Sequence, residues 1–182
     1  MTIRRNTLAI VTAACALLIG LSELEAAELD DVIQVQSDGS FRPGSGTCSR
    51  SIDEHLAKHP ELGEAVHMED QYLLDGGSFR DYTAGSIYLH PTYRCAFAVR
   101  FGFWERWKRA GRQNSIYGYP VSDELATQPG RSRQYFDTGS MWWTQARGVA
   151  ELHGGIATKH ALLGLDAGFP IASQTRDRKS VV

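Results

Sequence analysis

Two histidines four residues apart, His55 and His59, are the clearest candidates for metal chemistry in this 182-residue sequence. Side chains at that spacing share one face of a helix, as zinc ligands often do. The segment reads HLAKH and lacks the Glu of the His-Glu-x-x-His motif. No third ligand is marked by its spacing, although Glu61, His67 and Glu69 follow. We interpret the pair as solvated histidines on a polar helix, and we predict no metal site and no cofactor.

Carboxylate pairs are the next candidates, because glycoside hydrolysis uses two acidic side chains. Glu69-Asp70 and Asp123-Glu124 provide such pairs, but Glu69 and Glu124 fall at matching positions of an internal repeat. A repeated acid is better explained by a structural role than by a single catalytic centre. The sequence also lacks a Gly-x-Ser-x-Gly elbow and a glycine-rich phosphate loop. We predict no catalytic residue, and a metal-dependent wall hydrolase built on the histidine pair and Glu69 is the third and weakest interpretation.

Aromatic side chains are more informative, because a sugar can stack its C–H face on a ring while polar neighbours bond its hydroxyls. Neighbouring strand residues point to opposite faces, so one of Trp142 and Trp143 should be buried and the other outward. Alignment with Tyr88 of the preceding repeat places Trp142 inward. For Trp107 and Tyr88 we favour a core role, since both sit at apolar-periodic positions. The predicted ligand-binding residues are Trp143, Trp104, Tyr119, Gln145 and Arg147.

An internal repeat organises the chain, because most of residues 85–120 occurs again in residues 139–170. Both stretches contain a Gly-Ser pair before an aromatic, a small-and-apolar run, a glycine ahead of a ring, and a closing small-aromatic-proline motif. Corresponding positions are 54, 53 and 50 residues apart, so the spacing drifts only in loops. We predict structural roles for the repeated positions: Gly85, Tyr88, Gly102, Trp107, Gly118, Pro120, Gly139, Trp142, Gly155, Gly168 and Pro170.

This order of motifs resembles the LGFP repeat of secreted, cell-wall-associated proteins. Tyr135-Phe136 carries the opening aromatic pair and Tyr117–Pro120 carries the closing motif, while Leu62–Ala65 resembles a worn third copy of it. The resemblance implies units that form blades of a small β-propeller, whose ring closes with about five blades. The predicted fold class is therefore mainly β with short helices, arranged as an incomplete propeller.

Each full repeat is predicted to be three short strands followed by a helix. Three strands cannot bury both faces alone, so neighbouring units must cover each other. The strands are predicted at residues 86–90, 95–99, 134–136, 140–144 and 149–153, and the helices at 51–58, at 155–163 and before Gly111.

The leader is identified by Arg4 and Arg5 ahead of Leu8–Leu21, an apolar run of 14 residues. That run is too short for an ordinary membrane span, so residues 1–27 are predicted to be a signal peptide or an N-terminal anchor. The other predicted parts are a linker or arm at 28–48, a repeat domain at 49–175 and a disordered tail at 176–182. Within the repeat domain, a degenerate copy is expected at about 52–69 and full copies at about 78–124 and 132–174.

Cys48 and Cys95 are the only cysteines outside the leader. An even count in an exported protein favours one disulfide, and the alternative is two separate buried thiols. The net charge of −2 gives no reason to expect a nucleic acid partner.

The sequence predicts a secreted, non-catalytic binding module of the cell envelope, located in the periplasm or the cell wall. The resemblance implies cell-wall polysaccharide or peptidoglycan as its ligand. The alternative is an assembly or adaptor protein whose incomplete propeller is completed by another copy or by an envelope protein. An outward, aromatic-lined concavity would favour a glycan, and a flat, exposed apolar edge would favour a protein partner.

Overall fold

The computed structural model describes residues 31–174, which contain ten strands and three α-helices. The first strands are β1 (Ile33–Val35), β2 (Phe41–Pro43), β3 (Gln71–Tyr72), β4 (Ser78–Tyr82), β5 (Gly85–Leu89) and β6 (Ala96–Arg100). The later strands are β7 (Leu125–Gln128), β8 (Arg131–Phe136), β9 (Gly139–Thr144) and β10 (Gly148–His153). The helices are α2 (Ile52–Leu56), α3 (Phe101–Ala110) and α4 (Gly154–Leu163).

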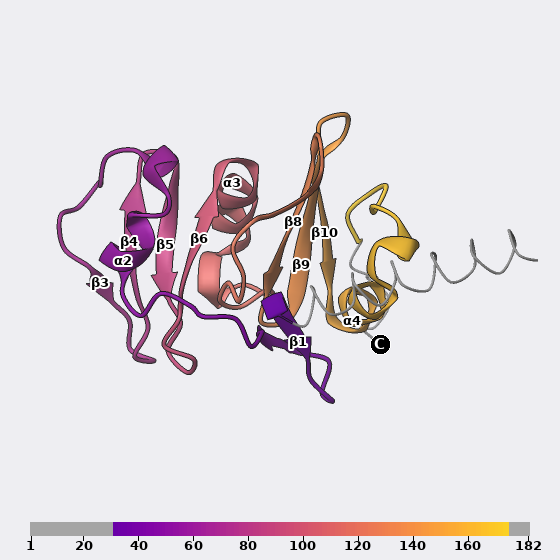
Figure 1. Ribbon diagram of the computed structural model, residues 1–182, viewed down its shortest axis with the longest axis horizontal. Coiled ribbons are helices and arrows are strands. Elements are labelled where there is room, and N and C mark those ends of the chain that lie inside the picture. Colours follow the sequence, from indigo (N-terminus) through magenta and orange to yellow (C-terminus); the bar gives the residue numbers. More distant parts are fainter. Residues whose placement is uncertain (1–30, 175–182) are drawn as a thin grey trace, which may run out of the picture.

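Two four-stranded antiparallel sheets dominate the fold (Figure 1). The first sheet has the order β3-β4-β5-β6 and the second the order β10-β9-β8-β7, so strands adjacent in sequence are adjacent in each sheet. The fold is mainly β with short helices, and its open sheets are consistent with an incomplete propeller, as predicted. Each sheet has one more strand than expected. The additional edge strands β3 and β7 lack a continuous apolar face, since both residues of β3 are exposed and β7 alternates.

Helix α3 lies between the two sheets and α4 lies beyond the second sheet (Figure 1), while α2 packs against the first sheet. On β5, Ile87 packs in a cluster with Ile52 of α2, while its neighbour Tyr88 packs in the cluster that contains Trp107 of α3. Ion pairs tie α3 and the short turn after it to both sheets. Arg106 of α3 lies 3.0 Å from Glu151 on β10, and Arg112, just after the helix, lies 3.0 Å from Asp81 on β4. Neighbouring units therefore cover each other, as the repeat pattern required.

The closing motifs attach to the sheets in the same way in both repeats. Ala65 forms an isolated bridge with Tyr82 at the end of β4, and Pro120 forms one with Phe136 at the end of β8. The segment with Ala65 is therefore the structural counterpart of Tyr117–Pro120, although it lacks the proline.

Glycines make this attachment close. A Cβ on Gly85 would lie 2.7 Å from Leu62 Cδ2, and a Cβ on Gly139 would lie 2.6 Å from Tyr117 Cδ1. Any side chain at these positions would displace the first residue of the preceding closing motif. The repeated Gly-Ser pair is thus explained by packing.

Trp107 on α3 and His160 on α4 occupy equivalent positions in the two repeats, and each ring makes an equivalent hydrogen bond. Trp107 Nε1 donates to the Gly118 carbonyl at 3.2 Å, and His160 Nε2 lies 2.9 Å from the Gly168 carbonyl. His160 therefore replaces Trp107 both in packing and in polar contact. This supports its interpretation as a packing substitution.

Of the two predictions for this segment, a linker or an arm, residues 31–48 are a packed arm and not a free linker. They include the β1–β2 hairpin, whose Ile33 and Phe41 are each 1% exposed and pack in a cluster with Tyr135 and Trp142. The segment is rich in Ser, Gly and Pro, so its two isolated apolar residues, Ile33 and Phe41, did not form a recognisable pattern in the sequence. Their role appears only in the packing against the second sheet.

The predicted disulfide is confirmed: Cys48 is bonded to Cys95, with 5.5 Å between their Cα atoms. Beside it, the Ala96 amide donates to the Ser49 carbonyl at 2.9 Å. The bridge thereby fastens the segment leading into α2 to the start of β6.

The predicted leader at 1–27 and tail at 176–182 lie outside the described residues. Within residues 31–174, no helix has both the length and the apolar character that a membrane crossing demands.

Candidate functional site

Trp143 lies on β9, opposite Val149 of β10 and Ser132 of β8. Its neighbour Trp142 points to the other face of the sheet, toward α4, and is 1% exposed, as predicted. Trp143 faces α3 instead. Its ring is partly buried against the cluster around Trp107 rather than fully outward, because α3 covers part of this face.

Two adjoining hollows meet at Trp143, and we call them together the Trp143 groove. One, of about 290 Å³, lies between the start of α3 and the second sheet, and the other, of about 420 Å³, lies against the β7–β8 hairpin. Trp143 and Glu124 line both. The first is further lined by Arg100 and Phe101–Phe103, and the second by residues 126–132.

Phe101 is a groove residue that sequence reasoning missed. Its ring is 53% exposed at the start of α3, and its backbone has a φ of +51°. A bulky side chain in that left-handed region is strained by roughly 1–3 kcal/mol. The equivalent residue of the second repeat is Gly154, with a φ of +55°, for which the conformation costs little. The signal was available in the sequence as a phenylalanine standing where the other repeat has glycine.

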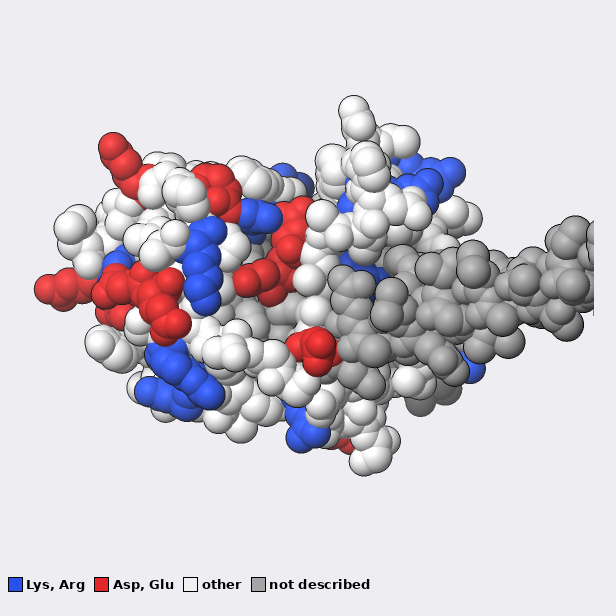
Figure 2. Space-filling model, in the orientation of Figure 1, with Lys and Arg blue, Asp and Glu red and all other residues white. Residues whose placement is uncertain are grey.

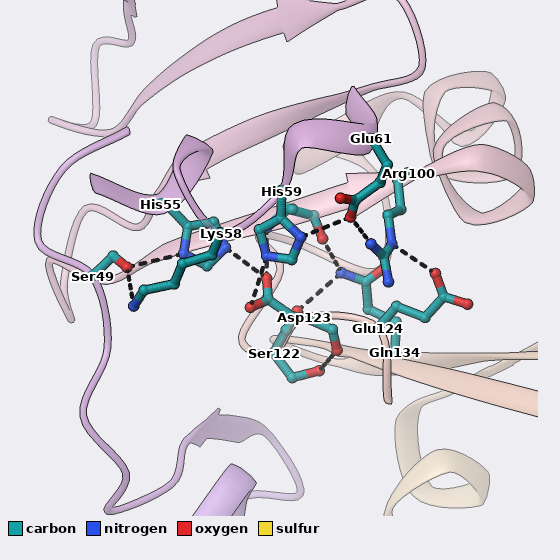
Figure 3. Close-up of polar contacts among 11 residues, drawn as sticks. Ser49, His55, Lys58, His59, Glu61, Arg100, Ser122, Asp123, Glu124 and Gln134 are labelled. Atoms are coloured by element: carbon teal, nitrogen blue, oxygen red, sulfur yellow. Dashed lines mark hydrogen bonds and ion pairs between the residues drawn. The ribbon is translucent and has the colours of Figure 1, made fainter. Parts of the chain in front are cut away.

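Charged side chains border the aromatic rings of the groove. Arg100 Nε donates to Glu124 Oε2 at 3.0 Å, and the same guanidinium also pairs with Glu61 (Figure 3). Arg131 lines the other hollow from the β7–β8 hairpin. Guanidinium donors and carboxylate acceptors thus lie beside exposed ring surface, which is the combination that hydroxyl-rich ligands require.

Two of the predicted ligand-binding aromatics are wrong. Trp104 is 6% exposed, because it packs in the cluster around Trp107 and the Arg112 guanidinium lies 4.7 Å from its ring centroid. Tyr119 is also 6% exposed, and its hydroxyl donates to Asp75 at 2.7 and 2.8 Å. Burial and that hydrogen bond raise the pKa of the Tyr119 hydroxyl, which remains a neutral donor. Both rings belong to the core.

The two polar candidates lie in the exposed β9–β10 turn. Gln145 lies next to the groove, since its backbone amide donates to the carbonyl of Gly130, a lining residue, at 2.9 Å. Arg147 is exposed and is not among the lining residues of either hollow. Of the five predicted ligand-binding residues, Trp143 lies in the groove and Gln145 beside it.

The histidine pair is not a solvated surface feature, contrary to our interpretation. His55 is 3% exposed, and its Nε2 lies 2.9 Å from Asp123 Oδ1. His59 Nε2 lies 3.5 Å from the other carboxylate oxygen. His67 and Glu69, which follow in sequence, are both exposed. The partner of the histidine pair is thus Asp123, which lies 68 residues after His55 in the sequence.

The visible surface carries charges of both signs. Acidic side chains gather over the end of the molecule that bears α2 and β3, with basic side chains between them (Figure 2). This face offers no continuous basic surface of the kind that binds nucleic acid.

Comparison with known proteins gives one family. The family model described as LGFP repeat matches residues 62–115 and 118–168. The first match begins at Leu62 in the worn closing motif, and the second spans the second sheet and α4. No curated protein matches the chain.

Proposed function

Because the chain belongs to the LGFP repeat family, we propose that it is a non-catalytic binding module that holds cell-wall polysaccharide or peptidoglycan in the Trp143 groove. LGFP repeats are typical of cell-surface proteins. The Cys48–Cys95 disulfide supports an oxidising compartment outside the cytoplasm, and export to the periplasm or cell wall is part of the proposal.

The observation that carries this proposal is the exposed Phe101 ring beside Trp143. The two rings offer apolar surface for the C–H faces of sugar units, and they lie between charged side chains that can bond hydroxyl groups. The strained backbone of Phe101 also supports a binding role, since strain of this kind concentrates at functional sites.

The dimensions of the groove suit a short stretch of a longer chain. Ligand pockets for small molecules usually enclose about 300–1,000 Å³. The hollow of about 420 Å³ falls in the lower part of that range, and the hollow of about 290 Å³ lies just below it. Both hollows open at the surface, so a polysaccharide can continue beyond them into solvent.

Replacing Phe101 by glycine separates binding from folding. The change restores the residue that the second repeat has at this position and removes the strain, so we expect an unchanged or slightly higher melting temperature. We expect retention on insoluble wall material to weaken about fivefold or more, as loss of an aromatic anchor costs about 1 kcal/mol or more. Trp143→Ala should weaken retention at least as much, with some loss of stability because the ring is partly buried.

The matched control is Tyr72→Ala, which removes an aromatic ring that is 84% exposed on the edge strand β3. Retention of this variant should equal that of the unaltered chain. If Phe101→Gly and Tyr72→Ala are both retained normally, or both lose retention equally, the groove is not the binding site.

A second candidate function, assembly with another protein or another copy, rests on the outer face of α4. Phe103 of α3 is 2% exposed against the second sheet, whereas its equivalent Ile156 on α4 is 52% exposed. Leu162 and Leu163 are 66% and 49% exposed on the same helix. Light scattering across a concentration series tests this candidate. A dimer that the Ile156→Glu substitution dissociates would support it. A chain that stays monomeric at every concentration would rule out self-assembly through α4.

A further inference from the structure

We propose that His55, His59 and Asp123 form a binding site for a divalent transition-metal ion of the zinc class. This site is separate from the Trp143 groove and does not depend on the proposed wall binding. The two histidines lie on and just after α2, and Asp123 lies in the loop that follows Pro120, 68 residues after His55 (Figure 3). The three candidate ligand atoms all lie within 4.8 Å of one another.

The outer nitrogen of each imidazole already has a partner. His55 Nδ1 lies 3.1 Å from Ser49 Oγ, and His59 Nδ1 lies 3.0 Å from Glu61 Oε1. With Nδ1–H donating to these oxygens, each ring presents an unprotonated Nε2 toward Asp123. Metal-binding histidines show the same arrangement, in which the second ring nitrogen donates to a carboxylate, carbonyl or hydroxyl and fixes the tautomer.

The spacing of the inner atoms fits a small tetrahedral ion. Metal–ligand bonds of 2.0–2.2 Å place neighbouring tetrahedral ligands about 3.3 Å apart. His55 Nε2 lies 2.9 Å from Asp123 Oδ1 and His59 Nε2 lies 3.5 Å from Asp123 Oδ2, so each imidazole faces a different oxygen of the carboxylate at close to that spacing. Two imidazole nitrogens with one carboxylate favour zinc-class ions over Ca²⁺ and Mg²⁺, which prefer oxygen ligands.

The carboxylate of Asp123 is held in place by its surroundings. Asp123 Oδ1 accepts the Ala98 amide at 2.8 Å, so the group is oriented without the metal. The nearby cations are engaged elsewhere, since Lys58 donates to Ser49 Oγ at 2.8 Å and Arg100 pairs with Glu61 and Glu124.

An ion at this position would link two parts of the fold that are far apart in sequence. It would join α2, which covers the first sheet, to the loop that leads into the second sheet. Three protein ligands leave one tetrahedral position, and the Asp123 side chain is 33% exposed, so water can supply the fourth ligand.

Zinc binding by the full chain tests the proposal. The protein is first treated with a chelator, and Zn²⁺ is then titrated in competition with a chromophoric chelator. We expect one ion per chain, with affinity reduced at least tenfold in His59→Ala and in Asp123→Asn. Glu61→Ala should weaken binding about 10–100-fold, as loss of an outer hydrogen-bond partner does. The control His67→Gln removes an exposed histidine outside the cluster and should bind as the unaltered chain does.

Three outcomes would overturn the proposal: no saturable binding, equal affinity in the unaltered chain and His59→Ala, or a loss of affinity in His67→Gln as large as that in His59→Ala. His59 is the decisive position if Asp123→Asn unfolds, because its side chain, 13% exposed, lies at the rim of the cluster. Thermal melting in chelator establishes that each variant is folded before its affinity is compared. A titration with Ca²⁺ should show no binding at the same concentrations.

Discussion

Trp142→Ala is expected to lower the free energy of unfolding by about 3–5 kcal/mol, the usual cost of deleting a buried tryptophan side chain. The ring is 1% exposed and packs edge-on against Tyr135, His160 and Phe169, with centroids 6.2, 4.5 and 5.1 Å away. Its Nε1 also donates to Ser140 Oγ at 2.9 Å, and that hydroxyl would lose its partner. Chemical denaturation measures the loss.

Trp143→Ala is the matched control for this variant, since it removes the same side chain one residue along the same strand. Because Trp143 is only partly buried, its loss should destabilise the chain clearly less. The two residues face opposite sides of β9. Whichever variant is less stable therefore identifies the tryptophan that faces the core. If Trp143→Ala were the less stable variant, the assignment of the two faces would be wrong.

Removing the disulfide is the second change with a large expected effect. The Cys48–Cys95 bridge spans a sequence separation of 47 residues, and closing a loop of that length stabilises by about 4 kcal/mol in the chain-entropy model. For a domain of this size, the double variant Cys48→Ala/Cys95→Ala should melt roughly 10 °C lower or more. The bridge also fixes Ser49, which bonds His55, so α2 should loosen first.

The unaltered chain with and without reductant is the control for the double variant. Reductant should lower the melting temperature of the unaltered chain toward that of the variant and leave the variant unchanged. Equal melting temperatures for variant and unaltered chain under oxidising conditions would show that the bridge contributes nothing to stability.

Local pattern was enough to predict the repeated elements. The strands β5, β6, β8, β9 and β10 and the helix α4 lie within a few residues of their predicted ranges. The N-cap of α2 is Ser51, whose hydroxyl accepts the Glu54 amide at 3.1 Å, and a serine three residues before a glutamate is a local capping pattern. These features depend on short-range periodicity and capping, which a single sequence displays.

The groove was only partly predictable, because its residues depend on how units pack. Trp104 lies off the apolar stripe of α3, and it is buried in the cluster around Trp107, with the Arg112 guanidinium 4.7 Å from its ring centroid. Phe101 could have been noticed as a phenylalanine where the second repeat has Gly154, but its left-handed backbone and its place in the groove appear only in the structure. The partner of the histidine pair was missed for a related reason: Asp123 is brought there by the closing motif of the first repeat, far along the chain.

Retention of the purified chain on insoluble cell-wall material, with release by soluble wall polysaccharide, tests the central claim most directly. Binding should be saturable, it should be reversed by soluble fragments of the wall glycan, and it should fall about fivefold or more in Phe101→Gly, a variant whose melting temperature is unchanged or higher. A chain that stays in the supernatant, or one whose retention survives both excess soluble glycan and Phe101→Gly, would contradict the claim that this protein binds wall polysaccharide through the Trp143 groove.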